Sequence, residues 1–221
     1  MTKKRFTLLV CVLFALCLFL GTVLLYYSRQ HLQSVTGTQQ QNKTASPEAL
    51  NHTENSAKNP FSHLGVPFTL TSASGKVRLS DFSGKLVILY FGFTSCPDIC
   101  PASLARIAHG LKQLETEQRE QIQTMMISVD PERDTATKLA EYVQFFAADF
   151  IGLTGEAQDI KRILTAYGSY ARKVTLPESA MGYTMDHGSK IYLLDRQGKV
   201  IKMFDHNILP DKLAAEISLL L

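Results

Sequence analysis

The chain has 221 residues, of which 45% are hydrophobic and 19% are charged, as is usual for globular proteins. Its formal charge of +3 equals the contribution of Lys3, Lys4 and Arg5, so the rest of the chain is neutral. A chain without a basic patch is not expected to bind nucleic acid.

The N-terminal part predicts a membrane anchor. Residues 6–27 contain no charge and would span about 33 Å as a helix, enough to cross a bilayer. This core is longer than that of a cleaved signal peptide, and it lacks a small-x-small exit. The cations within residues 1–5 predict that this tail stays in the cytoplasm. We therefore expect a single-pass protein of the bacterial inner membrane whose folded domain lies on the periplasmic side.

Residues 28–60 predict a flexible linker, because they are rich in Gln, Asn, Ser and Thr and carry almost no aliphatic pattern. The folded domain is expected over residues 61–221, a normal size for one domain.

Strand and helix signals alternate along this domain. A hairpin is expected around Ser74-Gly75, followed by an apolar run over 85–93 that is typical of a strand buried on both faces. The later signals predict a helix from about Pro101 to Leu114, a strand over 122–129, helices around 139–146 and 160–167, a hairpin formed by 191–194 and 200–204, and a last helix from Pro210. The second helix is expected to be capped by Asp134 or Thr135. A parallel core closed by an antiparallel hairpin predicts an α/β, thioredoxin-like fold with an N-terminal β-hairpin.

Two thiols follow the apolar run over 85–93 directly. Cys96 and Cys100 are the cysteines of the folded part, since Cys11 and Cys17 lie in the apolar N-terminal segment. Pro101 suits the first turn of a helix, so both sulfurs are expected near a helix N-terminus, where the helix dipole favours thiolate. The C-x-x-x-C spacing permits a disulfide and also lets two sulfurs share one soft metal ion.

A metal bound by two thiolates needs a further ligand, and His187 is the candidate. It lies just before the strand at 191–194, in a loop that should face the cysteine turn in a thioredoxin-like fold, at the place where thioredoxins normally carry a proline. Two thiolates and one imidazole at low coordination number suit Cu(I), and the imidazole also permits Cu(II).

Asp130 lies at the end of the strand over 122–129, at the carboxyl edge of the expected parallel sheet, where sites in α/β proteins gather. We expect it either to support the metal ligands or to contact a partner protein.

Three segments together resemble the Sco/SenC family of membrane-tethered copper chaperones: Phe-Gly-Phe-Thr-Ser-Cys96-Pro-Asp-Ile-Cys100-Pro, Ser-Val-Asp130-Pro-Glu-Arg-Asp-Thr, and Asp186-His187. The resemblance implies that Cys96, Cys100 and His187 hold copper. It also implies a role in assembling the copper A centre of cytochrome c oxidase, by delivering copper or by keeping the target cysteines reduced. The expected partners are the oxidase subunit with that centre and a copper donor or thiol reductase. One departure is Ser95, where the family often has histidine.

Two enzymatic alternatives remain open. A thiol–disulfide oxidoreductase would need Cys96 and Cys100 but not His187. A peroxiredoxin-like peroxidase would want a threonine three residues before the attacking cysteine, whereas Thr94 stands two residues before Cys96.

Overall fold

The computed structural model describes Thr22 and residues 59–221. The expected tail, the membrane span and all but the end of the linker therefore lie outside the described residues, Thr22 apart. Within the described part of the chain, no helix combines the length and apolarity needed to cross a membrane.

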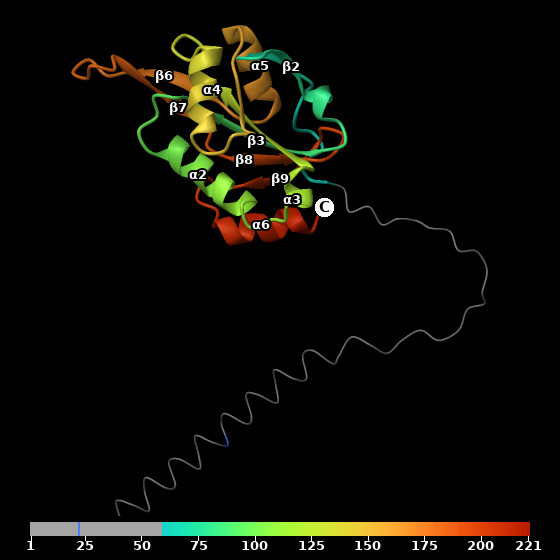
Figure 1. The fold of residues 1–221 in the computed structure, drawn as a ribbon. Helices are drawn as coiled ribbons and strands as arrows, with labels where there is room; N and C mark the ends of the chain where they lie inside the picture. Colours follow the sequence, from blue (N-terminus) through green and yellow to red (C-terminus); the bar gives the residue numbers. More distant parts are fainter. Residues whose placement is uncertain (1–21, 23–58) are drawn as a thin grey trace, which may run out of the picture. The chain divides into compact units, whose positions relative to one another are not determined.

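A five-stranded mixed sheet forms the centre of the domain, in the order β5–β4–β3–β8–β9 (Figure 1). Its strands are β3 Leu86–Gly92, β4 Ile122–Ser128, β5 Ile151–Leu153, β8 Ile191–Leu194 and β9 Val200–Phe204. Strands β3, β4 and β5 run parallel, whereas β8 is antiparallel to both β3 and β9. Every residue of β3 is buried, as the apolar sequence predicts for a central strand.

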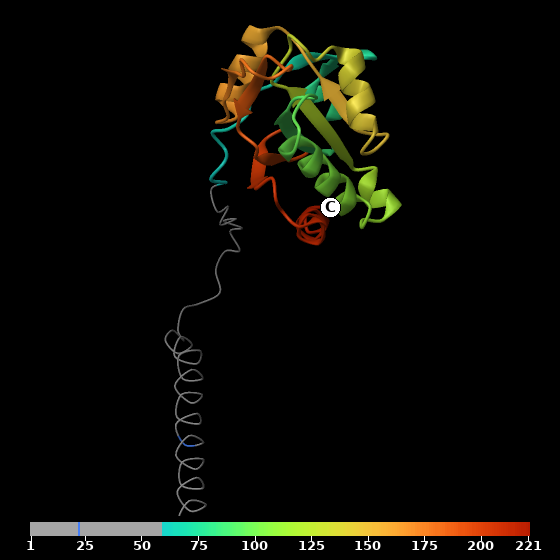
Figure 2. The ribbon, with the colours of Figure 1, turned by 90° about the vertical axis from the view of Figure 1, so that its left-hand side faces the viewer.

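Helices cover both faces of this sheet. In Figure 1, α2 and α6 lie below the sheet and α4 and α5 lie above it, and Figure 2 shows the same domain turned by 90°. The helices are α2 Ile99–Leu111, α3 Thr116–Arg119, α4 Ala136–Gln144, α5 Ala157–Ala166 and α6 Pro210–Ser218. The predicted order of the main strands and helices is confirmed. The short helix α3 was not predicted.

Two hairpins stand outside the central sheet. The predicted N-terminal hairpin is confirmed as β1 Thr69–Ser72 paired with β2 Gly75–Arg78, and the short 3₁₀ helix η1 Leu79–Phe82 follows it. The second hairpin was not predicted: β6 Ala171–Thr175 pairs with β7 Tyr183–His187. His187 is therefore the last residue of a strand. The prediction that it lies in a loop is wrong, because its backbone is paired with that of Ala171.

The cap of α4 is Thr135, whose hydroxyl accepts the N–H of Lys138 at 3.2 Å. Asp134, the other predicted cap, instead accepts hydrogen bonds from Thr94 and Ser128, which come from other parts of the chain.

Replacing Ile107 with alanine tests the packing of α2 against the sheet. The side chain is fully buried, so the cavity should lower the free energy of unfolding by about 2–5 kcal/mol. The control is His109→Ala on the exposed face of the same helix, which should change it by less than about 0.5 kcal/mol. Equal effects of the two substitutions in urea denaturation would contradict this packing.

Candidate metal site

The cysteine turn connects β3 to α2. Cys96 is half-buried and Cys100 is fully buried, and both thiols are free. The helix begins at Ile99, two residues before the predicted start, because the carbonyl of Asp98 accepts the N–H of Ala102 at 3.1 Å. The Cys96 sulfur accepts the backbone N–H of Cys100 at 3.4 Å. That N–H has no partner within the helix, so the sulfur acts as a cap. Pro101 still falls in the first turn, where its missing N–H costs nothing.

Gly92, at the end of β3, makes room for the buried thiol. A Cβ atom at this position would lie 3.0 Å from the Cys100 sulfur and 2.8 Å from a ring carbon of Tyr90. The thiol of Cys100 therefore packs directly against the strand backbone, and a side chain at position 92 would displace it.

His187 reaches the same sulfur from β7. Its Nε2 lies 3.6 Å from the Cys100 sulfur, and its Nδ1 lies 2.9 Å from the carbonyl oxygen of Gly188. A carbonyl only accepts, so Nδ1 carries the proton and the lone pair of Nε2 faces the thiol. The ring also meets that of Phe93 edge-on, with centroids 5.7 Å apart, which limits its orientation further. The structure thus brings His187 against the dithiol.

The pKa values of the two thiols are shifted in opposite directions. The hydrogen bond from the Cys100 thiol is the main cause that lowers the pKa of Cys96, to about 3. The same hydrogen bond between the sulfurs, together with burial, raises the pKa of Cys100. The pair is thus a thiolate at the surface and a thiol beneath it.

These donors fit a shared metal ion. Metal–nitrogen and metal–sulfur bonds of about 2.0 and 2.3 Å, at an angle of about 110–120°, put the two donors about 3.5–3.7 Å apart. The distance of 3.6 Å between Nε2 and the Cys100 sulfur matches that geometry. In the described residues, no three His, Cys, Asp or Glu side chains are already gathered as a metal site. The Cys96 sulfur, which accepts the Cys100 N–H, would supply the third donor.

Asp130 is only 2% exposed, and both its carboxylate oxygens are engaged. One accepts from Arg133 Nε at 2.5 Å and the other from the Tyr183 hydroxyl at 2.9 Å. The carboxylate of Asp130 is thus buried and paired within the domain, and its role as a support for the metal ligands or as a contact for a partner protein stays a prediction. Its partner Tyr183 begins β7, the strand that ends at His187.

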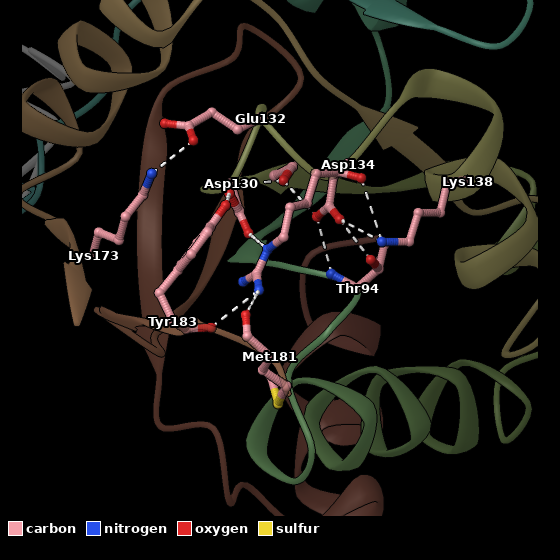
Figure 3. Close-up of polar contacts among 10 residues, drawn as sticks. Thr94, Asp130, Glu132, Asp134, Lys138, Lys173, Met181 and Tyr183 are labelled. Carbon is pink, nitrogen blue, oxygen red and sulfur yellow. Dashed lines mark hydrogen bonds and ion pairs between the residues drawn. The ribbon is translucent and has the colours of Figure 1, made fainter. Parts of the chain in front are cut away.

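Sequence reasoning missed the part played by Asp134. This carboxylate is 1% exposed and accepts the backbone N–H of Thr94 at 3.0 Å, the hydroxyl of Thr94 at 2.5 Å and the hydroxyl of Ser128 at 2.7 Å (Figure 3). It therefore holds the residue that leads into the cysteine turn. The high density of charged residues in the segment Asp130–Asp134 was the available signal in the sequence. It did not indicate which residues would donate hydrogen bonds to Asp134.

Comparison with known proteins identifies the family. A model of the SCO1/SenC family matches residues 56–221. A SCO2-like protein of Rickettsia felis is 38% identical over 142 residues, which cover 64% of this chain and 69% of the relative. The structure of Bradyrhizobium japonicum ScoI with copper bound is 36% identical, with a TM-score of 0.65, and the match covers 72% of this chain and 99% of that one.

A third relative, BsSco, has a disulfide switch and is a member of the Sco family of cytochrome c oxidase assembly proteins. It is 27% identical with a TM-score of 0.57, and the match covers 73% of this chain and 95% of that one. The predicted thioredoxin-like α/β fold and the resemblance carried by the three sequence motifs are both confirmed. This chain belongs to the SCO1/SenC family.

Proposed function

We propose that this chain binds one copper ion through Cys96, Cys100 and His187 and serves the assembly of the copper A centre of cytochrome c oxidase. The observation that carries the proposal is the Nε2 lone pair of His187, 3.6 Å from the Cys100 sulfur. Two relatives support it: ScoI was solved with copper bound, and BsSco belongs to a family of oxidase assembly proteins.

The chemistry of the donors favours Cu(I). Two thiolates and one imidazole form a soft, three-coordinate set, which suits a cuprous ion better than zinc, whose closed sites need four ligands. Cu(II) is the alternative oxidation state for the same residues. Binding releases the proton of Cys100, since the metal takes the thiolate.

Copper would leave by ligand exchange. Cys96 is half-buried whereas Cys100 is fully buried, so an incoming thiolate reaches the ion from the side of Cys96. Each incoming donor would replace one protein ligand, Cys96 first and then Cys100 and His187, so the ion would keep its coordination number and oxidation state. The proposed partners are the oxidase subunit that carries the copper A site and a copper donor or thiol reductase.

The proposed location is the bacterial inner membrane. The apolar residues 6–27 would anchor the chain with residues 1–5 in the cytoplasm, and the linker 28–60 would hold the domain on the periplasmic side. This arrangement would place the copper site on the periplasmic side, to which the N-terminal charges predict that the domain is exported.

Substituting the three ligands one at a time tests copper binding. The background is the full-length chain with Cys11→Ser and Cys17→Ser, which leaves Cys96 and Cys100 as its only thiols. His187→Ala, Cys96→Ala and Cys100→Ala should each weaken Cu(I) by more than about 100-fold in chelator competition, more than the loss of a residue that only supports a ligand. The control His109→Ala, on the exposed face of α2, should bind as the background does. Unchanged affinity in His187→Ala would remove this residue from the site.

Thiol–disulfide exchange is the second candidate, favoured by the asymmetry of the two thiols. The Cys96 thiolate would attack a disulfide of the target and release one of its thiolates. Cys100 would then lose its proton and attack Cys96, which leaves the target reduced and this chain with a Cys96–Cys100 disulfide. A peroxidase is disfavoured, because the Thr94 hydroxyl donates to Asp134.

The two candidates differ in their need for His187. If exchange is the function, His187→Ala should reduce a model disulfide at a rate within about twofold of the unsubstituted chain, while Cys96→Ala abolishes turnover. Loss of copper binding without loss of turnover in His187→Ala would show that the two activities are separable. Absence of turnover in the unsubstituted chain would leave copper binding alone.

The low pKa of Cys96 predicts its reactivity. A group with a pKa of about 3 is fully ionised above that pH, so alkylation of Cys96 by iodoacetamide should be nearly constant from about pH 5 to about pH 8. An ordinary thiol with a pKa near 8.5 would react about tenfold faster per pH unit over the same range. Cys100→Ala removes the main stabilising hydrogen bond and should restore that slope. Mass spectrometry of the alkylated peptide measures both rates, and a tenfold slope in the unsubstituted thiol pair would contradict the assignment.

A further inference from the structure

The strand that carries His187 does not belong to the central sheet. In the described residues, β7 forms backbone ladder pairs with β6 alone, and the two make a sheet separate from the central one. Figure 1 shows this hairpin at the edge of the domain, with its tip extending past the helices. A ribbon of two strands is only marginally stable by itself, so the position of His187 depends on what fixes the ribbon.

Arg133, in the β4–α4 loop, binds this hairpin through two hydrogen bonds and a ring contact. Figure 3 shows Met181 and Tyr183 of the hairpin beside Asp130 of the loop. Its Nη1 donates to the carbonyl oxygens of Tyr183 at 3.0 Å and Met181 at 3.4 Å. Its guanidinium carbon lies 3.7 Å from the centroid of the Tyr183 ring, which adds a cation–π contact. The same guanidinium is anchored in the loop by Asp130, which also receives the Tyr183 hydroxyl.

A second ion pair acts beside the first. Lys173 of β6 lies 2.6 Å from Glu132 and 4.3 Å from the centroid of the Tyr183 ring. Both residues of this pair are well exposed, so it adds little stability compared with the contacts of the buried Asp130.

The loop that holds the hairpin also holds the cysteine turn. Asp134, the residue after Arg133, receives the N–H and the hydroxyl of Thr94, two residues before Cys96. The loop segment from Asp130 to Asp134 thus contacts both halves of the site. Because both carboxylates are buried, their partners are costly to change, and the distance between the two halves is well defined.

We propose that Arg133 is a positioning residue, which fixes the β6–β7 hairpin to the β4–α4 loop so that His187 meets the two cysteines. This inference rests on the proposed copper function. Lysine cannot replace arginine here, because a single ammonium cannot bind Asp130 and the two hairpin carbonyls in a fixed fork while lying flat on Tyr183.

The test is a double-mutant cycle between Arg133 and His187 in the purified full-length chain with Cys11→Ser and Cys17→Ser. Arg133→Met should weaken Cu(I) roughly 10- to 100-fold in chelator competition, as expected for a residue that orients a ligand. In the His187→Ala background, Arg133→Met should lower the Cu(I) affinity by less than a further factor of about two, because Arg133 acts through the imidazole. Equal losses in both backgrounds, or no loss in either, would overturn the proposal.

Arg133→Lys keeps a positive charge beside Asp130 and decides the question if the methionine variant does not fold. Its effect should depend on His187 in the same way. The loss of Cu(I) affinity should be at least about fivefold, but smaller than in Arg133→Met. The matched control is Lys202→Met, which removes an ion pair with Glu216 between β9 and α6, and should leave copper binding unchanged.

A readout without copper separates this proposal from the proposed function. In the copper-free chain, proton NMR should show a nuclear Overhauser contact between the Phe93 and His187 rings, which lie 5.7 Å apart. The contact should persist in Lys202→Met and disappear in both Arg133 variants. Its persistence in those variants would overturn the positioning role, whereas failure of the unsubstituted chain to bind copper would overturn the proposed function alone.

Discussion

The contact between Nε2 of His187 and the sulfur of Cys100 joins parts of the chain that are 87 residues apart. It requires the imidazole to carry its proton on Nδ1, and the carbonyl oxygen of Gly188 enforces that tautomer. It also requires the Cys100 sulfur to pack closely against the backbone of β3, and the missing side chain of Gly92 leaves the space for it. A copper site built on this contact is therefore controlled by backbone groups as much as by the three ligands.

The β4–α4 loop contacts both halves of the site, the cysteine turn and the strand that ends at His187. Asp134 binds the residue that leads into the cysteine turn, and Asp130 with Arg133 binds the strand that ends at His187. Breaking a buried charge pair leaves an uncompensated charge, so these contacts resist small displacements better than exposed ion pairs would. The ligands can then sit on separate elements without the site losing its shape.

Sequence reasoning reached the elements with strong signals and missed those without. The apolar run of β3 and the turn residues before β9 predicted the sheet, and the position before β8 singled out His187. Strands β6 and β7 escaped because charged and half-buried residues fill them and seven residues separate them, which gives neither a clean alternation nor a tight turn. The role of Arg133 was not predicted, because its hairpin contacts lie 48 and 50 residues further along the chain and no local pattern indicates them.

X-ray absorption at the copper edge, on the full-length chain lacking Cys11 and Cys17 and loaded with one equivalent of Cu(I), tests the central claim most directly. The account predicts scattering from two sulfur atoms and one imidazole nitrogen, with the imidazole signal lost in His187→Ala. A spectrum of two sulfur atoms alone, identical in the two proteins, would contradict it.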